Sequence, residues 1–202
     1  MHLGLSPAPA NDSFTTAAVL EGVSYNVRAD LRGATFEVDE PRHPNFWFER
    51  GSLWWRWIAP ARGTAVVELE FDPDGDTPIA ALAVYEGTAL ESLVPVPASS
   101  RSWRVAFHAE AGDVFHIAVG SYSRAVGGFE FSVHLHEGPA NDQFADRIRV
   151  SGTSFETLVD LEYATRERDD PGGEFFDGSL WWTWTAPESG RIVLQARGDT
   201  RM

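Results

Sequence analysis

The chain has 202 residues, of which 43% are hydrophobic, and it carries a formal net charge of −14. A surface this acidic repels phosphate backbones and anionic lipids, which argues against a nucleic-acid partner or a membrane-surface role. The sequence contains no cysteine, which excludes disulfides and thiolate metal sites, and no apolar run approaches the roughly 20 residues that cross a bilayer, so no membrane insertion is expected.

Taken in chain order, the expected elements are one short helical turn and then strands. Asn11 and Asp12 precede residues 14–18, a pattern typical of a side-chain cap on one or two turns of helix. Beyond it, apolar and polar residues alternate with a period of two, which indicates half-buried strands. Strands are expected at 23–28, 53–58, 64–71, 79–85, 103–108, 114–119 and 129–135. Short strands separated by Gly, Pro and Asp turns predict an all-β fold, an antiparallel β-sandwich or jelly roll.

Two stretches of the chain occur twice. Residues 9–14 (PANDSF) return at 139–144 (PANDQF), and residues 51–60 (GSLWWRWIAP) return at 178–187 (GSLWWTWTAP). The first pair is offset by 130 positions and the second by 127, so the order of the motifs is kept and three residues are lost between them. A duplication of this kind predicts two structural units of one fold.

The repeat sets the expected domain plan. A leader at 1–8 precedes a first unit at 9–138, and a second unit at 139–202 stops about halfway through its repeat. We therefore expect a fragment of a longer protein, with any signal peptide lying outside it. Because half a sandwich leaves one sheet face uncovered, we expect the second unit to be less protected than the first, or paired with it or with another molecule.

Five motifs follow one another in a fixed order. They are P-x-N-D-x-F, G-A-T-x-E, S-L-W-W-x-W-x-A-P-x-x-G, L-A-V-Y-x-G and A-G-x-x-x-x-I-A-V, at 9–14, 33–37, 52–63, 82–87 and 111–119. This order resembles the bacterial pre-peptidase C-terminal domain family. The resemblance covers the first unit and the available half of the second. It implies a non-catalytic β-sandwich module, often in tandem, in secreted or cell-surface proteins; some relatives bind calcium, and some bind extracellular polymers such as collagen.

The tryptophan-rich strand carries the sharpest local signal. Trp55 and Trp57 share one face of it, and we predict that this face lies in the core. Trp54 and its copy Trp181 lie on the other face, where either a packed ring or an exposed platform for a sugar or peptide would fit. A second aromatic candidate lies in the loop that holds Phe46, Trp47 and Phe48, which either binds a ligand or folds back over an open end of the sandwich.

Acidic and amide side chains near the start of each unit form the best metal hypothesis. Calcium takes six to eight oxygen ligands, which separated segments can supply together. The alternative is that the Asn-Asp pair caps a turn and that the glutamate pairs with a nearby arginine. The candidate ligands are Asn11, Asp12, Glu37, Asp39 and Glu40, with Asn141, Asp142 and Glu167 as copies.

The sequence contains no nucleophile elbow, no zinc-protease helix motif, no phosphate loop and no cysteine nucleophile, so we expect no enzyme. We expect a spacer or adhesive module of a larger secreted or surface bacterial protein, with Ca²⁺ as the candidate stabilising ion. Its partners would be neighbouring domains and an extracellular polysaccharide or protein. The alternative is a carbohydrate- or protein-binding module that uses exposed aromatic residues.

Overall fold

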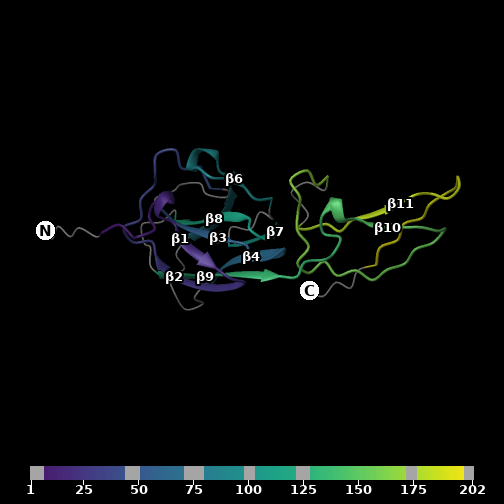
Figure 1. Ribbon diagram of the computed structural model, residues 1–202, viewed down its shortest axis with the longest axis horizontal. Helices are drawn as coiled ribbons and strands as arrows, with labels where there is room; N and C mark the ends of the chain where they lie inside the picture. Colours follow the sequence, from purple (N-terminus) through teal and green to yellow (C-terminus); the bar gives the residue numbers. More distant parts are fainter. Residues whose placement is uncertain are drawn as a thin grey trace.

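The computed structural model describes residues 7–43, 51–70, 80–97, 103–121, 128–171 and 177–197. Within these ranges the chain is almost entirely β structure, and its two main sheets form the predicted β-sandwich (Figure 1). The described residues include no helix that is long and apolar enough to cross a membrane.

One sheet of residues 9–138 has five strands in the order β1-β3-β8-β5-β6. Its strands are β1 (Ala18–Glu21), β3 (Ser52–Ile58), β8 (Val114–Ser121), β5 (Ala80–Glu86) and β6 (Val94–Pro95). Neighbouring strands are antiparallel except β1 and β3, which run parallel at the edge of the sheet. The alternation in the sequence did not predict β1 or β6, because four and two residues are too few to show a period.

The second sheet has four strands in the order β2-β9-β4-β7, all antiparallel. They are β2 (Ser24–Asp30), β9 (Gly128–His136), β4 (Gly63–Glu70) and β7 (Arg104–Ala109). β9 therefore lies between β2 and β4 and hydrogen-bonds to both. All seven strands expected from the alternation are present, with their ends shifted by a few residues at most.

Three single turns of 3-10 helix complete the described elements: η1 (Phe14–Thr16), η2 (Leu90–Ser92) and η3 (Phe144–Asp146). η1 stands where the sequence predicted a helical turn, but the predicted cap is wrong. Ser13 is the N-cap residue and makes no side-chain cap hydrogen bond. The side chains of Asn11 and Asp12 bind to more distant parts of the chain instead.

The core lies between the two sheets and is rich in aromatic rings. Trp55 and Trp57 of β3 point into it, as predicted, and are almost fully buried. The Trp55 ring stands edge-on to Phe131 of β9 with centroids 4.8 Å apart, and Trp57 stacks near Phe115 of β8 at 5.9 Å. Pairs in these orientations add about 0.5–1.5 kcal/mol each beyond the burial of their area.

The opposite face of β3 is buried as well. Trp54 belongs to a second apolar cluster with Ala83, Tyr85 and Ala118, and Phe14 from η1 covers it. The outer face of β3 is therefore covered at Trp54, whereas Arg56 on the same face is exposed.

The described part of residues 139–197 contains two short strands. β10 (Ile148–Val150) and β11 (Trp182–Trp184) pair in parallel, as β1 and β3 do. The described residues at 153–161 and 185–197 form no strand. They run as long extended stretches beyond the sandwich and leave apolar side chains exposed (Figure 1).

Candidate functional site

The repeated Asn-Asp turn binds the tryptophan strand in both halves of the chain. Asn11 Nδ2 donates to the carbonyl oxygen of Trp54 at 3.0 Å, and the Trp54 backbone N–H donates to the carbonyl of Asn11 at 2.9 Å. Asn141 makes the same two hydrogen bonds with Trp181, both at 3.0 Å. In the first half, this pairing lies just before the point where β1 (Ala18–Glu21) begins to pair with β3, at Trp55.

The aspartate that follows closes a second clamp. Asp12 accepts hydrogen bonds from the backbone N–H and the hydroxyl of Thr35, both at 2.6 Å. Asp142 holds Thr165 in the same way, at 2.5 Å for each bond. Because charge-assisted hydrogen bonds are about twice as strong as neutral ones, a carboxylate that accepts both donors of one threonine fixes the loop that contains the threonine.

The glutamates complete the repeated turn. Glu37 accepts the backbone N–H of Phe14 at 2.6 Å, and Glu167 accepts that of Phe144 at 2.7 Å. These bonds satisfy the first donor of η1 and of η3. Asn11, Asp12 and Glu37, together with their three copies, therefore hold neighbouring segments in place.

The remaining candidate ligands, Asp39 and Glu40, lie in different environments. Asp39 is exposed on a turn, with a left-handed φ of 70°, whereas Glu40 points into the interior. Across the described ranges, no group of three or more His, Cys, Asp or Glu side chains is arranged to hold a metal ion. The sequence did not show that backbone donors bind the side-chain oxygens of Asp12, Glu37 and Glu40.

The aromatic candidates have different positions. Trp54 is 0% exposed and lies edge-on to Phe14 at 5.4 Å, so the expectation of an exposed platform there is wrong. Trp181 is half-buried and edge-on to Phe144 at 5.1 Å in the same arrangement. The loop residues Phe46, Trp47 and Phe48 lie outside the described residues.

Glu40 belongs to a buried polar network that the sequence did not indicate. It accepts hydrogen bonds from the Ser52 hydroxyl and from the backbone N–H of Glu37 at 2.9 Å, and its Oε1 lies 3.0 Å from His43 Nε2. His43 Nδ1 lies 2.5 Å from the Tyr85 hydroxyl. A ring proton on Nε2 donates to Glu40, and the Tyr85 hydroxyl can then donate to Nδ1 of the neutral ring.

The network contains a serine, a histidine and a carboxylate, but not in an order that supports nucleophilic catalysis. Ser52 donates to Glu40, whereas a nucleophile needs its hydroxyl on the histidine. Glu40, His43 and Ser52 are also buried away from solvent. The arrangement therefore locks the 35–43 segment onto β3.

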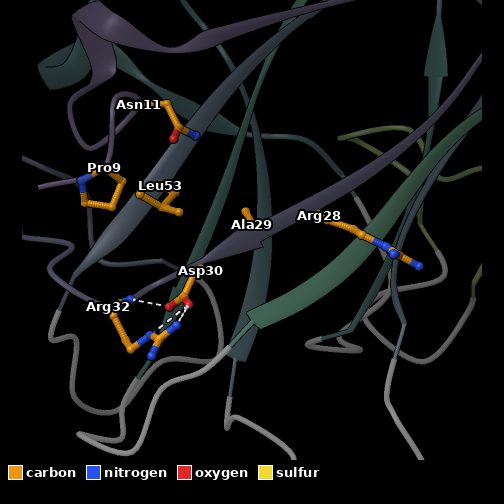
Figure 2. Close-up of a pocket in the computed structure, with 7 residues that line it drawn as sticks. All are labelled: Pro9, Asn11, Arg28, Ala29, Asp30, Arg32 and Leu53. Carbon is orange, nitrogen blue, oxygen red and sulfur yellow. Dashed lines mark hydrogen bonds and ion pairs between the residues drawn. The ribbon is translucent and has the colours of Figure 1, made fainter.

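An open pocket of about 510 Å³ lies beside this turn (Figure 2). Arg32 folds onto Asp30, with Nε 2.8 Å from the carboxylate, and this hydrogen bond lowers the pKa of Asp30. Arg28 points away and pairs with Glu130 at 2.7 Å. Both arginines already hold carboxylates, so the pocket offers no uncommitted charge among its lining residues, which are Pro9, Asn11, Arg28, Ala29, Asp30, Arg32 and Leu53.

The two halves of the chain meet at a polar junction. The Thr64 hydroxyl donates to the backbone carbonyl of Tyr163 at 2.6 Å. The Tyr163 ring stacks on His136, with centroids 4.0 Å apart and planes 10° from parallel. Both side chains are half-buried, and this burial lowers the pKa of His136 and raises that of Tyr163.

Charged side chains surround the stacked rings. Arg62 binds Asp146 across the junction and lies 3.3 Å from Glu110 on its own side. His108 contacts Glu110 at 3.0 Å and faces Asp142 at 3.8 Å. We use the term junction for the contacts of Arg62, Thr64, His108 and His136 with Asp142, Asp146 and Tyr163.

The comparisons with known proteins give weak likenesses. No protein-family model matches the chain, and no curated protein matches it. Among solved structures it is similar to the pre-peptidase C-terminal domain of a collagenase from Bacillus anthracis, with 11% identity and a TM-score of 0.37, over 64% of this chain and 99% of that one. It is also similar to PliG, a periplasmic inhibitor of g-type lysozyme from Aeromonas hydrophila, with 11% identity and a TM-score of 0.38, over 59% of this chain and 97% of that one. Likenesses this low carry no inference about function.

Proposed function

We propose that the chain is a non-catalytic accessory segment of a larger exported bacterial protein, built from two β-sandwich units of one fold joined end to end. Residues 9–138 form the first unit, and residues 139–202 belong to the second. The segment acts as a spacer that sets the distance and orientation of whatever it connects, at or outside the cell surface.

The repeated turn supports the proposal that both units share one fold. The clamps made by Asn11, Asp12 and Glu37 recur at the positions of their copies with distances within 0.1 Å of each other. The side chains that the sequence suggests as metal ligands thus form hydrogen bonds that hold neighbouring segments in place. These hydrogen bonds favour a structural role over a catalytic one.

The observation that carries the spacer proposal is the backbone of Tyr163. It adopts a left-handed φ of 61°, and its counterpart in the first unit, Gly33, has a φ of 84°. A side chain in this region costs about 1–2 kcal/mol and persists where surrounding contacts compensate for it. The compensating contacts here are the ring on His136 and the carbonyl on Thr64. Tyr163 thus keeps a strained backbone at a point where it contacts the first unit.

Residual dipolar couplings of the whole chain test the spacer proposal. We expect one alignment tensor to fit the amides of both units, because the junction holds them as one body. An Arg62→Ala variant, which removes the ion pair across the junction, should need two tensors. Arg28→Ala is the matched control, because Arg28 pairs with Glu130 inside the first unit and should leave the single tensor intact. Two tensors in the wild-type chain would refute the proposal.

Calcium stabilisation stays a prediction within this proposal. The test is a thermal melt in Ca²⁺ and in chelator, together with calorimetric titration of the wild-type chain. Alanine variants of Asp12 or Glu37 are poor tests, because losing their bonds to Thr35 and Phe14 destabilises the turn whether or not an ion binds. A melting temperature that chelator does not change would remove calcium from the proposal.

A further inference from the structure

The first unit meets the second with one row of side chains on its four-stranded sheet. Thr64 of β4 lies opposite His136 of β9 on one side and opposite His108 of β7 on the other. His136 stacks its ring on Tyr163, and Thr64 donates to the carbonyl of the same residue. His108 Nδ1 lies 3.8 Å from a carboxylate oxygen of Asp142. Histidine is the side chain whose charge ordinarily changes near neutral pH, so this row can link the junction to acidity.

His136 lies in surroundings that favour its neutral form. The Tyr163 ring covers one face of it, with the planes of the two rings 10° from parallel. His134 lies beside it on β9, with the ring centroids 6.1 Å apart. Burial is the main cause that lowers the pKa of His136; charge on His134 and Arg104 lowers it further, and Glu162 acts against them. A proton on His136 is therefore held less tightly while Tyr163 covers the ring than after Tyr163 has moved away.

The ion pairs that cross the junction are exposed. Arg62 binds Asp146 with 49% of its own side chain accessible to water, and Arg168 reaches a carboxylate of β5 at 3.5 Å with 50% accessible. Exposed pairs of this kind contribute little to stability. The left-handed φ of Tyr163 also costs energy, which the stacked ring helps to compensate. A change in the stack can therefore shift the junction between a closed and an open state.

We propose that the junction is an acid-sensitive hinge, in which a proton on His136 opens the stack on Tyr163 and frees the two units to move relative to each other. The inference rests on the proposed spacer function, which supplies the closed state. Because the pKa of His136 is lowered in the closed state, that state binds fewer protons than an open one. The closed state is thus fully favoured above about pH 6.5, the ordinary pKa of histidine, and is lost as the pH falls through the lowered value.

Two contacts act in the opposite direction. A positively charged ring is attracted to the face of an aromatic ring, which favours a stack of protonated His136 on Tyr163. A proton on His108, which lies 3.0 Å from Glu110 and 3.8 Å from Asp142, strengthens the pairing with both carboxylates. The direction of the pH effect therefore tests whether the burial of His136 is the larger influence.

Residual dipolar couplings of the whole chain at two pH values test the hinge. We expect one alignment tensor for both units at about pH 7.5 and two at about pH 5.5, on either side of the ordinary pKa of histidine. The single tensor should return when the pH is raised again. The couplings within each unit should keep fitting a tensor of their own at the lower pH; loss of that fit would show acid unfolding and overturn the hinge. An NMR titration of the His136 ring should give a midpoint below 6.5.

Two substitutions separate the charge of His136 from its ring. His136→Phe keeps an aromatic ring on Tyr163 and cannot take up a proton, so one tensor should fit at both pH values. His136→Gln removes the ring as well, so two tensors should be needed at both. His134→Asn is the matched control on the same strand, and it should keep the pH response because burial is the larger cause at His136.

The outcomes separate the hinge from the spacer. One tensor at both pH values in the wild-type chain would overturn the hinge and leave the spacer proposal intact. Two tensors at about pH 7.5 would refute the spacer proposal itself, and with it the hinge. A pH response that persists in His136→Phe, or a ring midpoint at or above 6.5, would overturn the role of His136.

Discussion

Removing the Ser52 hydroxyl is the sharpest test of the buried network. Ser52 is 1% exposed, and its hydroxyl donates to Glu40, whose side chain is fully buried and also faces His43. In Ser52→Ala the carboxylate loses one of its donors, and no water replaces that donor at a closed site. A hydrogen bond to a charged group contributes about 1.5–3 kcal/mol, and the volume lost is too small to add a large cavity term.

We therefore expect Ser52→Ala to lower the free energy of unfolding of the first unit by about 1.5–3 kcal/mol. For a unit of this size, one kcal/mol shifts the melting temperature by about 3–5 °C, so the variant should melt about 5–15 °C lower. Urea unfolding followed by tryptophan fluorescence gives the free energy, and calorimetry gives the melting temperature.

Two controls make the comparison specific. Ser179→Ala removes the corresponding hydroxyl of the second unit, which donates to the part-buried Asp170 at 2.6 Å. Water can replace it there, so the loss should be below about 1 kcal/mol. Ser92→Ala removes an exposed hydroxyl that donates to the carbonyl of Ala89 and should change stability by less than about 0.5 kcal/mol. If Ser52→Ala costs no more than Ser92→Ala, the network does not stabilise the unit.

Three further outcomes are expected. Burial lowers the pKa of His116 below its ordinary 6.5. The folded protein therefore binds fewer protons at this site than the unfolded chain does. The free energy of unfolding that depends on neutral His116 is fully present above about pH 6.5, and it falls as the pH drops through the pKa of the folded state. Urea midpoints measured across this window should lose most of that slope in His116→Phe, and an unchanged slope would contradict the assignment. Phe131→Ala should lower the free energy of unfolding in urea by about 3–5 kcal/mol, whereas Phe144→Ala, at a half-exposed ring, should lower it by less than about 1 kcal/mol. Equal losses would show that the core is not where the structure places it. Tyr163→Gly removes both the ring that stacks on His136 and the backbone strain of the left-handed φ. The free energy of unfolding should therefore change little, while the dipolar couplings should need two alignment tensors. A single tensor would show that the ring does not hold the junction.

Local patterns in the sequence determined the strands and one face of the core. The period of two predicted all seven long strands, and the spacing of Trp55 and Trp57 predicted that both face the interior, because a strand alternates its side chains wherever one face is buried. The repeat of the Asn-Asp turn was likewise visible from the sequence alone. These features depend on neighbouring residues, so they could be predicted without knowledge of the fold.

Only the tertiary structure decided what the polar residues do. Asp12 binds Thr35, and Asn11 binds the carbonyl of Trp54, across separations of 23 and 43 residues. No local period encodes such distances, and the same side chains would suit a cap, a metal or a clamp. Trp54 is buried because η1 folds over the outer face of β3, and Glu40 points inward because His43 and Ser52 meet it there. Burial on a second face and long-range hydrogen bonds arise only when distant segments pack together, so the local sequence pattern could not show these contacts.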